Sequence, residues 1–257
     1  MRFKIPLRQH NKQLVIKKEQ MPYNLITNRY FIPNDNAVIY RYLNEKKAFD
    51  LLKTSEIHFT RITDFPRYDE IMFSLSDKDW IKSHHEHLPK DECDAKTLKE
   101  IENYETMQQD GYINCWTNNT IESPGLWKDY VNNGNGIAIQ STVGQLKNAL
   151  AKTVNQIQIA RVHYFDSVGE RLGFFNGVWM LSRKITDFRQ ECEIRQIILL
   201  AHSIPGPAHI REPIDLRALV GQIILSPKSD PEFVKVINGL ASSMSLQSPI
   251  PSSLIRS

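Results

Sequence analysis

The chain has 257 residues, of which 41% are hydrophobic, and its 32 Lys and Arg exceed its 29 Asp and Glu to give a net charge of +3. This composition is typical of a globular protein and excludes collagen-like, coiled-coil and wholly disordered chains. The length suffices to bury a large core in one domain. The mild positive charge permits an anionic partner without requiring one.

The sequence indicates neither a membrane-spanning segment nor a disulfide framework. Its longest apolar stretches, around Ile197–Ala201 and Ile223–Leu225, are far shorter than the roughly 20 residues that cross a bilayer. The basic N-terminus lacks the apolar region of a secretory signal. Cys93, Cys115 and Cys192 are odd in number and form no C-x-x-C motif. We therefore expect a cytoplasmic protein with no membrane partner.

Residues 1–36 are polar and basic, and we expect an arm that packs on the rest of the protein or contacts an acidic partner. A domain is predicted to follow from residue 37. It opens with a strand over Ala37–Leu43, a helix over Asn44–Lys53 with Asn44 as N-cap, and a strand over Glu56–Ile62. A turn-rich loop, Asp64–Glu70, comes next.

A polar insertion at about 76–109, helical in its second half, separates these elements from the rest. After it, the patterns predict strands and short helices that interleave irregularly up to residue 241, followed by a disordered tail over 242–257. The expected strands are Gly111–Thr117, Gly136–Gln140, Gln156–Phe165, Arg189–Leu199 and Ala218–Leu225, and the expected helices are Ser123–Val131, Val143–Lys152, Phe174–Lys184 and Pro231–Leu240. No strand has the long Val/Ile run of a buried parallel sheet, so the sequence predicts an α+β fold with a largely antiparallel sheet.

Common catalytic fingerprints are absent from the sequence. It contains no P-loop, no G-x-G-x-x-G after a strand, no G-x-S-x-G and no H-E-x-x-H, which disfavours NTPases, Rossmann dehydrogenases, α/β-hydrolases and zincins. The cluster His84, His85, Glu86 and His87 lies in a charged, Lys-flanked stretch. We expect it to be solvated, and we expect no metal.

Arg41 lies among expected core positions of the first strand. Alternation places it on one face with Ile39 and Leu43, and places Tyr40 and Tyr42 on the other. Because burial of an unpaired guanidinium is costly, Arg41 needs an anion. That anion is either a carboxylate of the chain or a bound phosphate or ribose-phosphate.

Two further places can carry chemistry. Trp116, Trp127 and Tyr130 can form an aromatic wall that stacks on a base or a nicotinamide ring, and they are equally consistent with core packing. Glu191 and Glu193 lie two positions apart on an expected strand and would share a face, with Arg195 or Lys184 available to balance their charge. The residues leave open a charged strand face or a functional E-x-E pair.

Taken in order, the motifs Y-R-Y, F-T-R-I-T-D-F, C-W-T with L-W-K-D-Y, G-I-A-I, K-x6-E-x-E-x-R and L-V-x-x-I-I-L-S-P resemble a bacterial family known only as a domain of unknown function. The resemblance runs from about Ala37 to Leu240. It departs at Pro66–Glu70, where P-R-Y-D-E stands in place of the family's N-D-P-F-E.

The arrangement also resembles the ADP-ribosyltransferase superfamily, which implies a fold of split, mostly antiparallel sheets flanked by short helices. The resemblance implies an NAD-dependent ADP-ribosyltransferase with NAD as co-substrate. It makes Glu193 the catalytic carboxylate and Glu191 the residue that orients the acceptor. The residues that it places at NAD are Arg41, Tyr42, Trp116, Thr117, Trp127 and Tyr130. The residues expected at the acceptor are Arg61, Arg67 and Arg195.

The chemistry accounts for these residue types. Cleavage of the nicotinamide–ribose bond passes through an oxocarbenium-like state, as in glycoside hydrolysis. A carboxylate that binds the ribose 2′-OH stabilises this developing charge, and its loss is expected to cost about 10²–10³ in rate.

Compact enzymes of this type resemble toxins of toxin–antitoxin or phage-defence modules, so a neutralising antitoxin protein is a further expected partner. The basic arm, with Arg61 and Arg67, favours RNA or other nucleic acid as the acceptor. The alternatives are a protein acceptor, a non-catalytic nucleotide or nucleic-acid sensor, a structural interaction protein, and a metal-dependent nuclease that uses Glu191, Glu193 and His84–His87.

Overall fold

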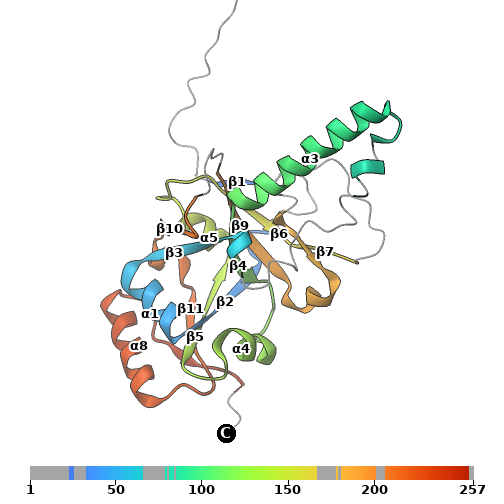
Figure 1. The fold of residues 1–257 in the computed structure, drawn as a ribbon. Helices are drawn as coiled ribbons and strands as arrows, with labels where there is room; N and C mark the ends of the chain where they lie inside the picture. Colours follow the sequence, from blue (N-terminus) through green and yellow to red (C-terminus); the bar gives the residue numbers. More distant parts are fainter. Residues whose placement is uncertain are drawn as a thin grey trace, which may run out of the picture.

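A computed structural model describes residues 23–25, 33–65, 79, 81–83, 85–166, 178, 181–200 and 206–254. Most strands in these ranges join one mixed sheet, in the order β1-β6-β9-β4-β2-β5-β11-β12, with β3 on β4 and β10 on β3 (Figure 1). These strands are β1 (Tyr23–Leu25), β2 (Val38–Asn44), β3 (Glu56–Arg61), β4 (Gly111–Thr117), β5 (Gly136–Thr142), β6 (Ile157–Arg161), β9 (Glu193–Leu199), β10 (His209–Pro213), β11 (Gln222–Leu225) and β12 (Ile250–Pro251). All pairs are antiparallel except β1–β6 and β11–β12.

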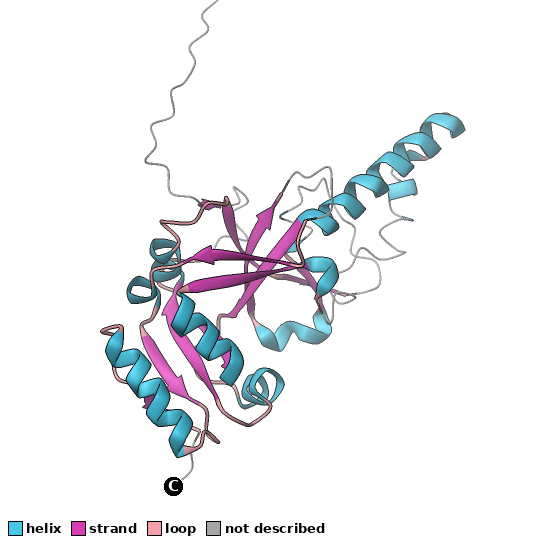
Figure 2. Cartoon of the chain, turned by 60° about the vertical axis from the view of Figure 1, so that its left-hand side comes forward, coloured by secondary structure: helices cyan, strands magenta, loops and turns pink. Residues whose placement is uncertain are grey.

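Short helices flank the sheet, as Figure 2 shows. They are α1 (Glu45–Thr54), α4 (Pro124–Val131), α5 (Val143–Ala149), α7 (Leu216–Leu219) and α8 (Pro231–Ser243), with 3-10 turns η1 (Ile62–Asp64) and η3 (Thr186–Glu191). A longer helix, α3 (Lys90–Asp110), has 21 residues. A second, two-stranded sheet pairs β7 (His163–Phe165) with β8 (Arg183–Ile185) in parallel. The expected α+β class with a mostly antiparallel sheet is therefore confirmed.

Local sequence signals account for the ends of these helices. The Asn44 side chain accepts a hydrogen bond from the Lys47 N–H and caps α1, as predicted, and Ser123 caps α4 in the same way. The α1 helix ends at Ser55, which takes a left-handed conformation with φ 52°. The strands β2 and β3 are thereby joined by one compact helix.

The main core lies on one face of the sheet, beneath α1, α5, α7 and α8. Strand β2 alternates as predicted, because Ile39 and Leu43 enter this core while Tyr40 and Tyr42 pack with α4 on the opposite face. Arg41 therefore leaves β2 on the side of Ile39 and Leu43, between an apolar core and the space next to β4.

The sheet forks at β4. Strand β2 pairs with β5 along seven positions but with β4 at the single position Tyr40↔Thr117. Further along β4, the pairing strand is β3, through Thr60↔Ile113 and Arg61↔Tyr112. Two strands that α1 connects thus leave the same edge of β4 and diverge from it.

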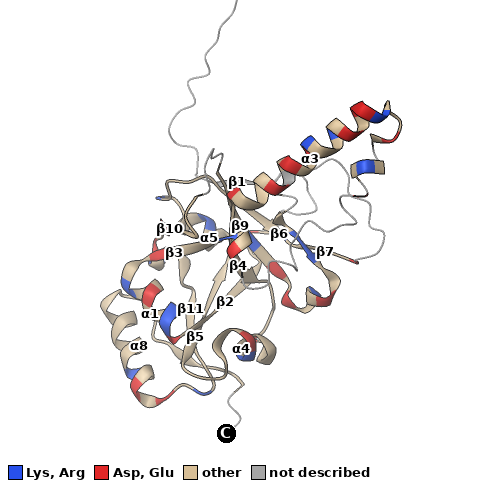
Figure 3. Cartoon of the chain, viewed as in Figure 1, with Lys and Arg blue, Asp and Glu red and all other residues tan. Residues whose placement is uncertain are grey.

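Helix α3 corresponds to the second half of the predicted polar insertion. It projects from the body of the protein (Figure 1), and Figure 3 shows acidic and basic residues interspersed along it. Its first turn carries Asp91 and Glu92, and Lys96 pairs with Glu92 at 3.0 Å. Over the described ranges, no helix combines the length and the apolar character that a membrane span requires.

Several predicted boundaries are wrong. The strand expected over Arg189–Leu199 begins only at Glu193, because Thr186–Glu191 forms η3 and Cys192 is left-handed with φ 45°. Arg183 and Lys184 lie on β8 and not in the helix expected over Phe174–Lys184. Strand β10 was not predicted, since His209–Pro213 is short and polar and ends in proline.

The tail predicted to be disordered over 242–257 is folded up to Leu254. Helix α8 extends to Ser243, and β12 pairs in parallel with β11. Ser252 and Ser253 then donate hydrogen bonds to the buried Glu122 carboxylate. A carboxylate 130 positions away in the sequence therefore determines the order of this segment.

Candidate functional site

The divergence of β2 and β3 leaves a cavity of about 110 Å³ beside β4. Arg41, Tyr42 and Leu43 of β2 form one wall, and Asn114–Thr117 of β4 form another. The carboxylates of Glu191 and Glu193 also border the cavity. Cationic and anionic groups from distant parts of the chain thus face the same space.

A larger cavity of about 650 Å³ adjoins the first, beneath α1 and beside β3 and β10. Both cavities are bordered by the same five residues, which are Arg41, Leu43, Lys47, His58 and Thr60. Arg41 and Lys47 therefore lie at the junction of the two cavities.

Arg41 reaches the junction without a carboxylate partner. No hydrogen bond or ion pair connects its guanidinium to another residue in the described part of the chain. The group lies over the Trp116 ring, with 5.9 Å between its carbon and the ring centroid. Burial lowers the pKa of Arg41 to about 10. The sequence left open whether the anion is a carboxylate of the chain or a bound phosphate. The carboxylate is disfavoured, because no described residue supplies one to Arg41.

A hydrogen-bonded chain fixes Trp116 beneath Arg41. The Trp116 Nε1–H donates to Asn114 Oδ1 at 2.9 Å, and the Asn114 amide donates to the His58 carbonyl of β3 at 2.6 Å. Burial and the nearby Arg211 charge lower the pKa of His58. These hydrogen bonds hold the Trp116 ring in place beneath Arg41, and the His58 ring lies at the junction.

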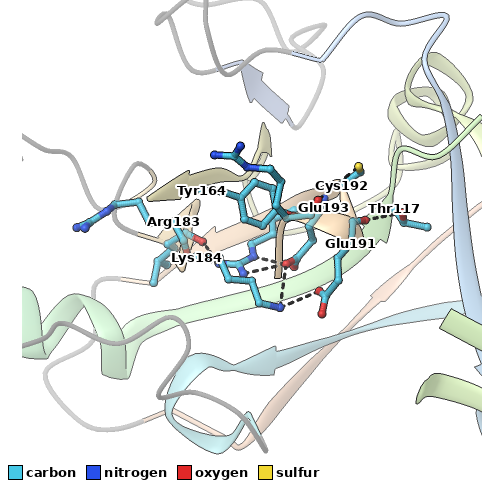
Figure 4. A network of polar contacts seen from close by, with 10 residues as sticks. Thr117, Tyr164, Arg183, Lys184, Glu191, Cys192 and Glu193 are labelled. Atoms are coloured by element: carbon cyan, nitrogen blue, oxygen red, sulfur yellow. Dashed lines mark hydrogen bonds and ion pairs between the residues drawn. The ribbon is translucent and has the colours of Figure 1, made fainter. Parts of the chain in front are cut away.

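Glu191 and Glu193, which border the cavity, belong to a group of four buried charges (Figure 4). Arg195, fully buried, donates to Glu193 from Nε at 2.8 Å and from Nη2 at 3.0 Å. Lys184 Nζ lies 2.7 Å from Glu191 Oε2 and 3.6 Å from Glu193 Oε2. The two positive charges balance the two negative charges, and their mutual attraction offsets the free-energy cost of burying them.

The electrostatics within this group distinguish the two carboxylates. Burial alone would raise the pKa of Glu193, but the charge and hydrogen bonds of Arg195, together with Lys184, outweigh it and hold the pKa at about 2. The Cys115 thiol contributes a further hydrogen bond to Glu193, and burial raises the pKa of that thiol. Glu193 is thus ionised at neutral pH, and both of its oxygens accept hydrogen bonds from Arg195. Glu191 is bound by Lys184 through Oε2.

The turn between these glutamates is held from both sides. The Thr117 hydroxyl donates to the Glu191 carbonyl at 2.5 Å, and the Asn118 N–H donates to the Cys192 carbonyl at 2.8 Å. The Glu193 N–H donates to the Tyr164 hydroxyl at 2.8 Å. Glu191 and Glu193 therefore converge on the cavity through a fixed left-handed turn and not, as predicted, through two positions of one strand face.

The expected aromatic wall is only partly formed. Trp116, Tyr42 and Tyr130 border the small cavity, but Trp127 does not. Trp127 is 2% exposed, packs edge-on against Tyr42 with 4.8 Å between centroids, and donates to Glu122. The expectation that Trp127 contacts a cofactor is therefore corrected, since it belongs to the core.

Of the arginines expected at the acceptor, Arg61 and Arg195 do not border the cavity. Arg195 is fully buried and also donates to the Leu181 and Arg183 carbonyls, so it is a structural residue. Arg61 is paired with Asp64 at 2.5 Å and donates to the Gly206 carbonyl. Arg67 and most of the basic arm lie outside the described residues.

The sequence reading missed several residues of the site. They are Lys47, His58, Asn114, Cys115, Tyr164 and Lys184, of which Lys184 was considered only as a counter-ion. Lys47 lies in the first turn of the helix that directly follows the strand of Arg41, so its proximity to Arg41 could have been expected from the sequence. The other residues could be recognised only once the pairing of β2, β3 and β4 was known.

No group of three or more metal-ligating side chains occurs within the described ranges. His84 lies outside those ranges, and His85 Nε2 is 2.9 Å from Glu100 Oε2. Comparison of the chain with protein-family models, with curated proteins and with solved structures finds no match.

Proposed function

We propose that the protein is an ADP-ribosyltransferase that binds NAD at the fork of its sheet. One observation carries this proposal: the cavity is bordered on one side by Arg41, which no described residue pairs, and elsewhere by Glu191 and Glu193. Arg41 suits a phosphate oxygen of the dinucleotide, because its planar donor fork is otherwise unused. We interpret the divergence of β2 and β3 as the sheet split of the ADP-ribosyltransferase-like fold.

The reaction explains why a carboxylate is needed opposite the arginine. Departure of nicotinamide leaves positive charge on the ribose, and a carboxylate on the 2′-OH stabilises that charge more than it stabilises the ground state. Trp116 and Tyr130 would confine the nicotinamide ring. Tyr42 would support that wall from β2, and Thr117 would hold the backbone of Glu191.

We assign the substrate-facing role to Glu191 and a positioning role to Glu193. Both oxygens of Glu193 are bound by Arg195, which leaves little capacity for a sugar hydroxyl. Glu191 borders the same cavity and accepts a hydrogen bond from Lys184 at 2.7 Å. This assignment reverses the order that the E-x-E analogy suggests.

The acceptor that we propose is a nucleic acid, with RNA favoured, and a protein acceptor is the alternative. Lys53 and Arg211 border the larger cavity and add basic groups near the fork. An effector of this kind in a toxin–antitoxin or phage-defence module would require a neutralising partner protein.

The test uses labelled NAD with purified protein and, separately, total RNA, DNA and cell protein. We expect label in one pool, with loss of about 10²–10³ in rate for Glu191→Gln. Glu232→Gln, an exposed change on α8, is the matched control. The absence of both label transfer and nicotinamide release in every pool would refute the proposal that the protein is an ADP-ribosyltransferase.

A nucleotide sensor is the second candidate, and the saturated state of Glu193 favours it. A sensor needs Arg41 but no available carboxylate. It would bind NAD or ADP-ribose with the same affinity in the wild type and in Glu191→Gln, and it would release no nicotinamide.

A further inference from the structure

Lys47 lies at the junction of the two cavities and was assigned no role by the sequence. It is in the first turn of α1, where its backbone N–H is capped by Asn44. Its side chain borders both the small and the large cavity, as does that of Arg41. Two cationic groups, one from β2 and one from α1, therefore converge on one place.

The carboxylates near this place are already engaged. Asp50 and Glu56, which border the large cavity, are both bound by Arg211, at 3.3 Å and 3.1 Å. Asp50 also lies 2.8 Å from His58 Nε2. No hydrogen bond or ion pair engages the Lys47 ammonium or the Arg41 guanidinium within the ranges that the structure describes.

The two cations repel each other in the protein without ligand. Partial burial and the Arg41 charge both lower the pKa of Lys47. A ligand with two linked phosphates carries negative oxygens on two phosphorus centres, so one phosphate can pair with Arg41 and the other with Lys47, which offsets their repulsion. A monophosphate can carry a similar charge but concentrates it on one centre.

We propose that Lys47 acts with Arg41 to select ligands that carry a diphosphate over ligands that carry one phosphate. This inference rests on the proposed function, because NAD and ADP-ribose contain a diphosphate. It adds a specificity-determining residue and a ranking of ligands: pyrophosphate above orthophosphate, and ADP-ribose above AMP.

The experiment measures the dissociation constants of these four probes by calorimetry for the full chain and its variants. Lys47→Gln preserves the helix and the backbone cap, since glutamine is a good helix former. We expect this variant to raise the dissociation constants of pyrophosphate and ADP-ribose by about tenfold or more. Those of orthophosphate and AMP should rise by about threefold or less.

Lys46→Gln is the matched control, because Lys46 is the preceding residue of α1 and borders the large cavity but not the small one. It should change each affinity by less than about twofold. Equal losses for Lys46→Gln and Lys47→Gln, or an equal loss of mono- and diphosphate binding in Lys47→Gln, would overturn the inference. So would failure of the wild type to bind pyrophosphate and ADP-ribose.

The outcomes separate this inference from the proposed function. Selective diphosphate binding without transfer from NAD would uphold the role of Lys47 and refute the enzyme. Transfer from NAD whose KM does not respond to Lys47→Gln would uphold the enzyme and refute the role of Lys47.

Discussion

Glu193→Gln should destabilise the protein strongly, whatever its effect on activity. The substitution removes the negative charge that faces fully buried Arg195 and nearby Lys184. Holding the pKa at about 2 in place of the ordinary 4.5 corresponds to about 3 kcal/mol, at 1.36 kcal/mol per pH unit. Breaking a buried ion pair typically costs about 3–5 kcal/mol. The two figures agree, and we expect a loss of about 3 kcal/mol or more.

Urea denaturation at pH 7 measures this loss through the midpoint and the slope. Because the folded-state pKa of Glu193 is depressed, its contribution is fully present above pH 4.5 and disappears as the pH falls toward 2. The variant should therefore lose less stability than the wild type between these pH values. Glu191→Gln is the comparison, and it should cost less, since Lys184 keeps Glu193 nearby.

A free energy of unfolding for Glu193→Gln within about 1 kcal/mol of the wild type would contradict this prediction, because a buried cation that loses its carboxylate partner should destabilise the protein by more than that. The result also decides how activity data are interpreted. If Glu193→Gln is strongly destabilised, its inactivity says nothing about catalysis, and Glu191→Gln becomes the informative variant.

Three further outcomes follow from the buried Glu122 and its neighbours. Glu122→Gln should lower the free energy of unfolding by about 1–3 kcal/mol in urea at pH 7. The reason is that hydrogen bonds from Ser252, Ser253 and Trp127 outweigh burial and lower the pKa of Glu122. A loss of stability confined to pH below 4.5 would contradict this prediction. Truncation after residue 246, which removes Ser252 and Ser253 but leaves Trp127, should cost at least as much, and an unchanged denaturation midpoint would show that the tail contributes nothing. Trp127→Ala should cost about 3–5 kcal/mol, whereas Tyr130→Ala, at a residue 41% exposed, should cost under about 1 kcal/mol and weaken the binding of NAD more than that of ADP-ribose; the reverse order of stability losses would contradict the assignment of Trp127 to the core and Tyr130 to the site.

The sequence by itself determined the local structure of this protein. Asn44 and Ser123 mark helix starts because a side-chain oxygen satisfies a backbone N–H three residues away, within reach of any local pattern. The alternation along β2 likewise places Arg41 on the core side, since successive side chains of a strand point to opposite faces. These features depend only on neighbouring residues.

Only the tertiary structure decided what those residues meet. The left-handed Cys192 breaks the expected strand, so the relation of Glu191 to Glu193 depends on Thr117 and Tyr164, 74 and 29 positions away from their respective partners. Trp127 is core and not site because Glu122 accepts its N–H and Tyr42 packs against it. Such partners are brought together by the pairing of distant strands, and no spacing along the chain encodes which of them meet.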